Sequence, residues 1–512
     1  MEPIPDVEIK PIVKGMWQEE WLSYKAAPEG VATWLENAAD DTLGYITTRR
    51  PFKRRTPASG ISISSPTAAF ITNQLSGTNG DYVQLYFQQG RDLNQQQLVT
   101  SASGTVYSNF FGNTSKNRYD VIQKTLLMTN VGGASAVYYH TGNTTTPAAL
   151  DTKFPSSTDL IAAGFVGRVW GASSTASLPN LYYSDVIPSG GITSLSTAAQ
   201  QFLVVNSRNE GITALVQTPD VLFVFTNNYI FRVFNTNSIE NAPFYNVGTV
   251  SQESITKTRD AFYFYHYSGI YSLSTSGALK KISDPIYYLL KRIKPANAKS
   301  VFGWTQDIFV YFYLGQLSGY PTNKYYIVKY NTATGNWSII TTKTALVLGV
   351  SMDISEFAVN ETATSENWYP PNIIMTSSEM ATLDIFDQSA DDQSVYGDFN
   401  SSGTSEKNIN IDVRTEWIDF GKENHVKRIS GLSVPHFNAA GLTLAYQIDN
   451  DPEDKWETVG ALDNEPVTLF RDFQTKYFNR IKFRFFGESY GARMKFTMPT
   501  VIKLDDTGYA RG

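Results

Sequence analysis

Residues 221–234 read Val-Leu-Phe-Val-Phe-Thr-Asn-Asn-Tyr-Ile-Phe-Arg-Val-Phe, and residues 261–273 read Ala-Phe-Tyr-Phe-Tyr-His-Tyr-Ser-Gly-Ile-Tyr-Ser-Leu. Each stretch joins two apolar or aromatic runs through a tight turn, and each follows a shorter apolar run and an aspartate, Asp220 or Asp260. This pattern predicts a meander of antiparallel strands. One such unit cannot cover its own apolar faces, so copies must pack side by side, as the blades of a propeller do.

Further units of this kind precede and follow the pair. Residues 164–185 repeat the order of strand, loop and strand, and a unit that opens at Asp307 ends at Trp337. The aspartates at 220, 260 and 307 are spaced by 40 and 47 residues, which is within the period of four-stranded blades. Weaker copies occupy 61–160 and 346–387. We therefore predict an all-β chain with a propeller-like domain of repeated antiparallel blades over residues 61–390.

The C-terminal part has a different pattern. Residues 391–408 are rich in Ser, Asp and Gly and are expected to form a linker. Beyond them, apolar residues alternate strictly with polar ones, for example at Ile409, Ile411 and Val413. A period of two over several runs indicates a half-buried antiparallel sheet. We predict a β-sandwich over 409–512.

Residues 1–60 are expected to be a short, partly helical docking segment. Val31, Trp34, Leu35 and Ala38 follow the spacing of an amphipathic helix. A second short helix is predicted over 286–293, where Ser283-Asp284-Pro285 supplies an N-cap and a first-turn proline.

A basic run lies at the end of the N-terminal segment. Arg49, Arg50, Lys53, Arg54 and Arg55 form a candidate contact with another subunit or an adaptor protein. The alternative is a solvated loop or an edge strand. Five charges in an otherwise acidic chain make a patch too small to hold DNA unaided, which favours this alternative.

Composition narrows the possible functions. The net charge of −6 does not suit tight binding of a polyanion, which needs clustered Lys and Arg. The chain has no cysteine, which excludes disulfides and thiolate metal sites. No apolar run approaches the roughly 18 residues of a membrane span, and no signal peptide is recognisable at the start, so we expect a chain that is made and kept soluble.

The sequence also lacks the motifs of common enzymes. The sequence contains no phosphate-binding, dinucleotide-binding, nucleophile-elbow or zinc-protease motif. With only four histidines, a catalytic triad or a histidine-rich metal site is disfavoured. The adjacent aspartates at 40–41, 391–392 and 505–506 lie in expected loops or termini, which disfavours a glycosidase. The acidic stretch Asp449–Asp454 could offer oxygen ligands to calcium, but a plain hairpin loop is favoured because the glycine and distal glutamate of a calcium loop are missing. We expect no enzyme activity and no cofactor.

The order of these units resembles that of the tail nozzle, or packaged-DNA stabilisation, proteins of short-tailed bacteriophages. The resemblance covers residues 160–340 and 409–504. It rests on Gly164–Asp185, on Gly211–Phe234 with the following Val250-Ser-Gln-Glu-Ser-Ile, and on the turn Tyr330-Asn-Thr-Ala-Thr-Gly-Asn-Trp. In the sandwich it rests on Thr415-Glu-Trp-Ile-Asp-Phe-Gly and Arg480-Ile-Lys-Phe-Arg-Phe. The first 160 residues resemble that family little.

The resemblance implies a structural virion protein of the tail, made in the host cytoplasm. Such proteins form a ring, usually of six copies, below the portal and its adaptor, in contact with other tail proteins. Phage DNA is retained by this conduit and passes through it at ejection, without sequence-specific binding. An acidic wall suits that passage because it does not bind the polyanion. The alternative is a phage adhesin that binds a host-surface glycan or protein through a propeller scaffold.

Overall fold

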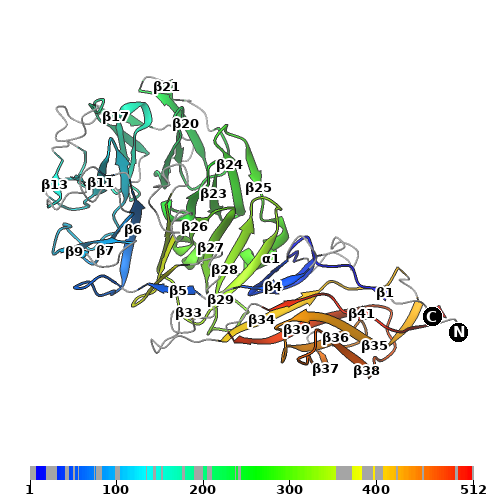
Figure 1. Ribbon diagram of the computed structural model, residues 1–512. Coiled ribbons are helices and arrows are strands. Elements are labelled where there is room, and N and C mark those ends of the chain that lie inside the picture. Colours follow the sequence, from blue (N-terminus) through cyan, green and yellow to red (C-terminus); the bar gives the residue numbers. More distant parts are fainter. Residues whose placement is uncertain are drawn as a thin grey trace.

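The computed structural model of this chain is almost entirely β (Figure 1). It describes residues 7–18, 31–40, 45–49, 52–55, 57–73, 75, 83–98, 104–133, 135–141, 146–150, 154–175, 179–188, 200–203, 210–236, 238–239, 244–352, 372–382, 396–397, 408–421, 425–452, 455–490 and 494–509. The all-β class expected from the sequence is confirmed.

Within these residues, seven antiparallel sheets follow one another along the chain from residue 66 to residue 382. The first three sheets lie within residues 66–203, where the repeats in the sequence are weak at first and become clear from residue 164. They consist of β6 (Pro66–Thr72), β7 (Gln84–Gln89), β8 (Asp92–Gln97) and β9 (Gly104–Tyr107); β10 (Tyr119–Ile122), β11 (Thr125–Thr129), β12 (Val137–His140) and β13 (Ala148–Ala149); and β14 (Leu160–Ala163), β15 (Val169–Ala172), β16 (Asn180–Tyr183) and β17 (Gln200–Leu203).

The next three sheets include the two stretches whose repetition predicted the fold. They consist of β18 (Ala214–Gln217), β19 (Leu222–Phe225), β20 (Ile230–Asn235) and β21 (Ser238–Ile239); β22 (Ile255–Lys257), β23 (Ala261–His266), β24 (Gly269–Ser274) and β25 (Leu279–Lys281); and β26 (Phe302–Gln306), β27 (Phe309–Gly315), β28 (Tyr325–Asn331) and β29 (Trp337–Thr342).

The seventh sheet is completed by strands from distant parts of the sequence. Its first three strands are β30 (Leu348–Ser351), β31 (Asn372–Met375) and β32 (Met380–Thr382). Next to β32 lies β5 (Phe52–Arg55), which in turn pairs with β33 (Tyr396–Gly397). Most of the expected linker 391–408 lies outside the described residues, but β33 belongs to this sheet.

The seven sheets are arranged in cyclic order. Strands β6, β10, β14 and β18 lie side by side in turn, as do β22, β26 and β30, and β30 returns to contact β6. One buried apolar cluster lies between each neighbouring pair of sheets; between the fourth and fifth, for example, the rings of Phe225 and Phe264 are 5.3 Å apart. We interpret this order as propeller-like, and closure into a propeller stays a prediction. The seven sheets in this cyclic order are called the ring of sheets below.

Polar side chains near the start of one sheet bind backbone groups of an adjacent sheet. The carboxylate of Asp120 on β10 accepts the amide of Ala163 on β14 at 2.7 Å. These contacts satisfy backbone groups that would otherwise be buried without a partner. Three more side chains bind the backbone of the preceding sheet: Gln217 Oε1 accepts the amide of Phe165 at 2.9 Å, Gln252 Oε1 accepts the amide of Leu215 at 2.8 Å, and Thr305 Oγ1 donates to the carbonyl of Lys257 at 3.2 Å.

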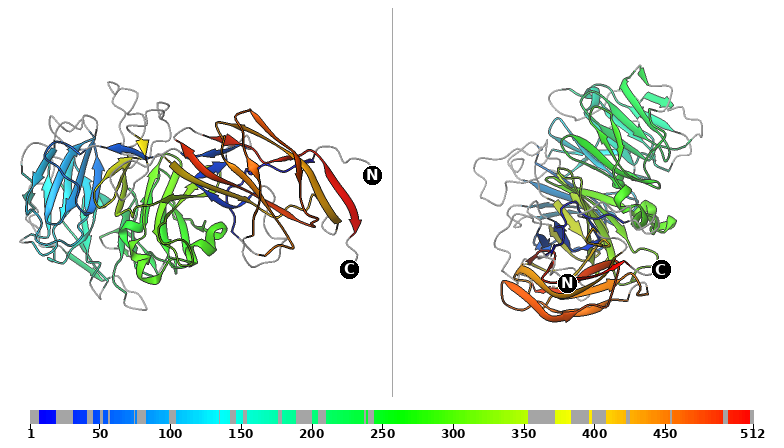
Figure 2. Two further views of the ribbon diagram at one scale, coloured as in Figure 1. Left: turned by 90° about the horizontal axis from the view of Figure 1, so that it is seen from below. Right: turned by 90° about the vertical axis from the view of Figure 1, so that its right-hand side faces the viewer.

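The C-terminal strands form two further layers together with strands from the N-terminus (Figures 1 and 2). One layer extends the sheet of β29 through β2 (Ala32–Glu36), β34 (Asn408–Thr415), β39 (Ile481–Tyr490), β36 (Thr443–Ile448) and β37 (Glu457–Ala461). The other contains β1 (Val7–Glu8), β3 (Ala38–Asp40), β4 (Ile46–Thr48), β35 (His425–Phe437), β38 (Val467–Gln474), β40 (Lys495–Phe496), β41 (Thr500–Val501) and β42 (Leu504–Tyr509). The layers pack through residues such as Phe485 and Phe496, whose rings are 4.7 Å apart.

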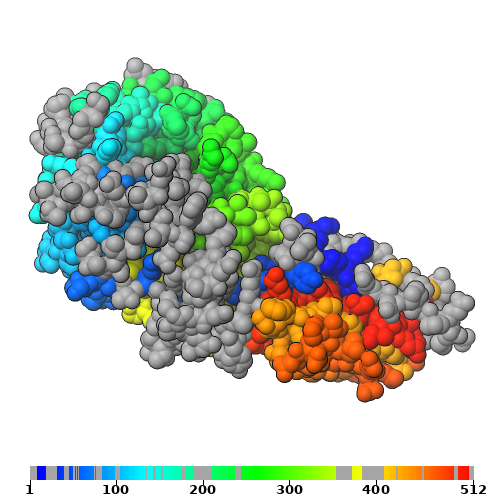
Figure 3. Space-filling model, in the orientation of Figure 1, coloured from blue at the N-terminus to red at the C-terminus, as the bar shows by residue number. Residues whose placement is uncertain are grey.

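The prediction of a helix near residue 31 is wrong. Val31, Trp34, Leu35 and Ala38 lie in or beside β2 and β3, where Leu35 pairs with Val413 of β34. A central strand is buried on both faces, so its apolar residues need not alternate, and here they match a helical period by coincidence. Among the described residues before 50, β1 to β4 lie in the C-terminal layers, and the role of this region as a docking segment stays a prediction (Figure 3).

The helix predicted after Ser283 is confirmed. It consists of η3 (Asp284–Ile286) and α1 (Tyr287–Lys291), while η1 (Phe165–Gly167), η2 (Gln252–Ser254) and η4 (Pro295–Ser300) are single 3-10 segments. The Ser283 side chain does not cap the helix, because its Oγ accepts the amide of Ile270 at 2.9 Å.

The contact between β10 and β14 predicts a pH dependence of stability. Burial raises the pKa of Asp120 from 3.8 to about 7, although hydrogen bonds from the amides of Ala163 and Val121 oppose this shift. A carboxyl group whose pKa is raised on folding stabilises the fold fully below pH 3.8, and this contribution is lost as the pH rises through 7. From pH 5 to pH 8, the free energy of unfolding of the wild type should fall relative to that of Asp120→Asn by on the order of 2 kcal/mol. Denaturant unfolding of both proteins at both pH values tests this, and a difference that does not change with pH contradicts it.

Candidate functional site

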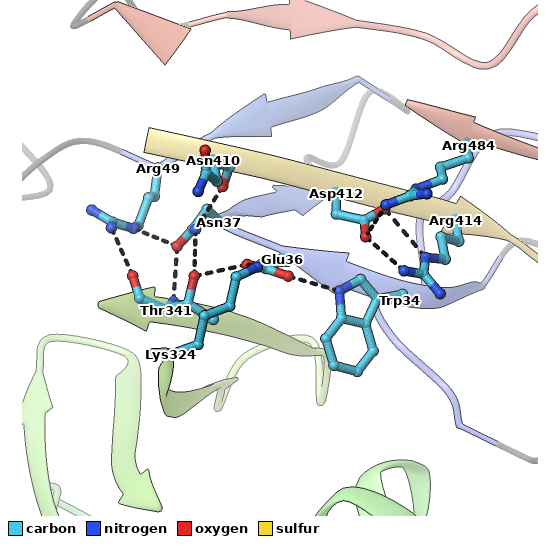
Figure 4. Close-up of polar contacts among 10 residues, drawn as sticks. All are labelled: Trp34, Glu36, Asn37, Arg49, Lys324, Thr341, Asn410, Asp412, Arg414 and Arg484. Carbon is cyan, nitrogen blue, oxygen red and sulfur yellow. Dashed lines mark hydrogen bonds and ion pairs between the residues drawn. The ribbon is translucent and has the colours of Figure 1, made fainter. Parts of the chain in front are cut away.

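The junction between the ring of sheets and the C-terminal layers holds a network of buried polar contacts (Figure 4). Strand β2 lies between β29 of the ring and β34 of the C-terminal part, and it pairs with both. The main-chain amide of Asn37 continues this connection by donating to the carbonyl of Ile339 at 2.7 Å. Side chains at 36 and 37 then reach both neighbours.

Glu36 is a buried carboxylate with several partners. Its side chain is 3% exposed. Its Oε1 accepts the hydroxyl of Thr341 at 2.8 Å and lies 2.5 Å from Nζ of Lys324, while Oε2 accepts the indole N–H of Trp34 at 3.1 Å. A carboxylate removed from water destabilises the fold unless it is paired and hydrogen-bonded, and this one has both kinds of partner. Since Lys324 and Thr341 come from the ring, the charge of Glu36 ties β2 to the sixth sheet.

Asn37 uses all of its hydrogen-bonding capacity. Its Oδ1 accepts Nε of Arg49 at 2.7 Å and the amide of Thr341 at 3.0 Å. Its Nδ2 donates to the hydroxyl of Thr341 at 2.9 Å and to the carbonyl of Asn410 at 2.7 Å. The residue has a φ of 56°, in the left-handed region that asparagine tolerates better than most residues. Asn37 therefore both turns the chain out of β2 and joins the ring to β34.

Asp412 forms a second polar centre on β34. Arg484 of β39 binds it through Nε and Nη2 at 2.8 and 2.9 Å, and Arg414 binds it through Nε and Nη2 at 3.2 and 2.8 Å. Two-pronged arginine pairs of this kind hold a carboxylate in a fixed orientation. The guanidinium of Arg414 also lies 5.9 Å from the ring of Trp34. This centre orders the C-terminal side of the junction.

The structure places most of the predicted basic contact residues within the fold. Lys53, Arg54 and Arg55 form strand β5, which pairs with β32, and Arg50 lies outside the described residues. Arg49 binds Asn37, donates from Nη2 to the carbonyl of Thr341 at 3.2 Å, and lies 5.0 Å from the ring of Phe52. Because β5 lies between β32 and β33, it is not an edge strand, and the role of the run in contacting another protein stays a prediction.

Several of the other candidate groups that fall on described residues have structural partners, whereas neither ring nitrogen of the buried His140 is hydrogen-bonded there. His266 Nδ1 lies 2.6 Å from Oγ of Ser268, and burial lowers the pKa of His266. His425 and Asp506 are 3.0 Å apart. Asp451, from the acidic stretch 449–454, lies 3.7 Å from Lys455, and residues 453 and 454 lie outside the described part. Among the described residues, no three His, Asp or Glu side chains are grouped as metal ligands would be. No helix in these residues is long and apolar enough to cross a membrane.

No family model matches the chain, and the search of curated proteins finds no relative. Solved structures are similar at a low level. The extracellular domain of a hybrid two-component system from B. thetaiotaomicron is 9% identical with a TM-score of 0.41, and that of a one-component system from the same organism is 9% identical with a TM-score of 0.42; each match covers 88% of this chain and 59% of the other. The AfRom2 CNH domain is 11% identical with a TM-score of 0.36, over 64% of this chain and 98% of that domain. This chain thus spans about three fifths of the length of the first two, and TM-scores below 0.5 carry no inference about function.

Sequence reasoning missed the junction. The signal that could have found it is the pair Glu36-Asn37, which interrupts an apolar run from Val31 to Ala39. Polar residues within such a run need buried partners. Those partners lie some 300 or more residues away in the sequence, at Lys324, Thr341 and Asn410, so the pattern alone could not identify them.

Substitution of Asn37 tests the junction directly. Asn37→Ala removes four hydrogen bonds and places alanine in a left-handed conformation, so the free energy of unfolding should fall by about 3 to 4 kcal/mol. Asn37→Gly removes the same bonds without the backbone strain and should be the more stable variant by about 1 kcal/mol. Urea unfolding of the three proteins provides the measurement. If Asn37→Gly is as stable as the wild type, the side chain does not hold the junction.

Proposed function

We propose that this chain is a structural virion protein of a short-tailed bacteriophage, the subunit of a tail nozzle ring below the portal and its adaptor. In this role it forms a conduit that retains packaged DNA and passes it at ejection. The proposal begins from the sequence resemblance over residues 160–340 and 409–504. The junction supports it, because it makes the ring of sheets and the C-terminal layers one body.

The observation that carries the proposal is the continuous sheet from β26 to β37. Parts of a chain that meet only at their surfaces usually move relative to one another unless the contact is large and apolar. Here one sheet passes through both parts, and one buried apolar cluster also includes residues of both, such as Val328 in the ring and Phe483 in the C-terminal layers. A subunit built this way keeps its shape under load, which the wall of a conduit requires.

The charge of the chain fits the same role. With a net charge of −6, the protein as a whole repels a polyanion weakly. Such a wall allows DNA to slide, whereas a basic wall would hold it by releasing counterions.

A row of exposed apolar side chains offers a surface for contact between subunits. Val467 and Leu469 on β38 are 41% and 44% exposed, and Phe437 at the end of β35 is 64% exposed. Val467 pairs with Pro435 and Leu469 with Ser433, so the three apolar side chains project from the same face of the sheet. We propose that this row contacts the neighbouring subunit of the nozzle ring.

Electron microscopy of the purified full chain tests the proposal. A ring with an axial channel is expected, alone or after addition of the portal and adaptor of the same virion. A chain that remains monomeric at high concentration, and that binds no portal-side partner, contradicts it. Binding of the isolated chain to host cells or glycans would favour the adhesin instead.

The apolar row gives a more specific prediction. The double variant Val467→Lys, Leu469→Lys should lose ring assembly, because it places charges in the contact between copies. Its free energy of unfolding should change by only about 0.5 kcal/mol, since both side chains are exposed. Thr458→Lys on β37, an exposed position in the other layer, is the matched control and should assemble normally. Mass photometry measures assembly. Normal assembly by the double variant would show that this surface does not form the contact between subunits.

A further inference from the structure

A cavity of about 280 Å³ lies among the first strands of the ring of sheets. Its walls come from β6, from residues 116–119 before and in β10, from η2 and β22, and from β26 and β30 with the residues beside it. Five of the seven sheets thus contribute to one space. The Lys116 side chain in its wall is 38% exposed, so this part of the wall is in contact with solvent.

The charged groups around the cavity are mostly cations, in contrast to the chain as a whole. Lys116, Arg118 and Lys257 line it, and Glu253 is the single carboxylate among the lining residues. Nζ of Lys116 lies 3.1 Å from Oε1 of Glu253, and the guanidinium of Arg118 contacts the same oxygen. Burial alone would raise the pKa of Glu253, but the charges of Arg118 and Lys116 hold it at about 2, so this carboxylate stays ionised. One carboxylate oxygen therefore serves two cations, and the cavity has an excess of positive charge in a chain whose net charge is −6.

Four residues in the wall also carry buried hydrogen-bond donors that have no partner among the described residues. These donors are the hydroxyls of Thr67 and Tyr119, Nδ2 of Asn117 and Nε of Arg118. The other polar groups of Asn117 are occupied: its Oδ1 accepts the amide of Val131 at 3.2 Å, and its own amide donates to Gln88 at 3.0 Å. Buried donors are nearly always paired in folded proteins. A set of unpaired donors around one cavity indicates a ligand rich in acceptors.

Part of the remaining wall is apolar. Phe70, Ile255, Phe302 and Leu348 line the cavity together with the polar groups. Small-molecule sites typically combine an apolar wall with a few convergent polar groups that fix orientation. The volume is at the lower end of the range for such sites, which limits the ligand to a compact molecule.

We infer that this cavity binds a small organic oxyanion, a carboxylate or phosphate attached to a compact apolar group. The oxyanion would accept hydrogen bonds from the unpaired donors of the wall, close to the positive charges of Lys116 and Arg118. These donors belong to Thr67, Asn117, Arg118 and Tyr119. The apolar group would lie against the phenylalanines. This site is separate from the junction and does not depend on the proposed role in a virion.

Isothermal titration of the full chain tests the inference with four probes: benzoate, phenyl phosphate, inorganic phosphate and the uncharged benzyl alcohol. Benzoate or phenyl phosphate should bind, and whichever binds more tightly identifies the preferred oxyanion. Benzyl alcohol should bind at least about tenfold more weakly, because it leaves the cations and donors without a charged acceptor.

Two variants separate binding from folding. Tyr119→Phe removes the hydroxyl donor and keeps the aromatic side chain. It should weaken binding of the oxyanion about fivefold or more. Tyr107→Phe is the matched control, because its hydroxyl bonds Gln95 at 3.3 Å and the residue does not line the cavity. Binding to the control should be unchanged. The inference is overturned if neither organic oxyanion binds the wild type, if benzyl alcohol binds as tightly, if inorganic phosphate alone binds, or if Tyr119→Phe binds like the control.

Discussion

Strand β2 joins the two parts of this molecule, because it pairs with β29 on one side and with β34 on the other. Its hydrogen bonds run in two directions, so neither part can move away without breaking a sheet. Glu36 and Asn37 strengthen this constraint with side chains that reach Thr341 in the ring and Asn410 in the C-terminal layers. A buried polar network stabilises a fold when every member is satisfied and is costly when one is missing. Asn37, with both donors and both acceptor sites in use, meets that condition.

The ring of sheets depends on two kinds of contact repeated around it. Apolar clusters between neighbouring sheets supply the burial that no single sheet could achieve, and polar side chains such as Asp120 and Gln217 bind the backbone of Ala163 in β14 of an adjacent sheet. Strand β5 comes from the N-terminal region and completes the last sheet beside β32. This pairing joins residues far apart in the sequence. It also places part of a basic run inside the sheet, because β5 lies between β32 and β33.

Much of the fold could be predicted from local patterns, and the junction could not. The turn at Asn227-Asn228 connects β19 to β20 as its sequence indicates, and β23 is joined to β24 through Tyr267 and Ser268, directly before Gly269. The alternation at Ile409, Ile411 and Val413 gives the buried face of β34. By contrast, Leu35 and Ala38 match a helical period, and that region is strand because β2 pairs with β29 and β34 and β3 pairs with β4. The cavity was missed for the same reason: Thr67, Lys116 and Glu253 come from three sheets, and the sequence does not show that these strands meet.

The central claim is that the ring of sheets and the C-terminal layers unfold as one unit through β2. Native-state hydrogen exchange at the amide of Asn37, which donates to Ile339, tests it most directly. The amide should exchange only through the same global opening that exposes amides in the core strands β27 and β39, with an equal free energy of opening. Exchange of this amide with a markedly lower free energy, while β27 and β39 remain protected, would show that the two parts separate at the junction and would contradict the account.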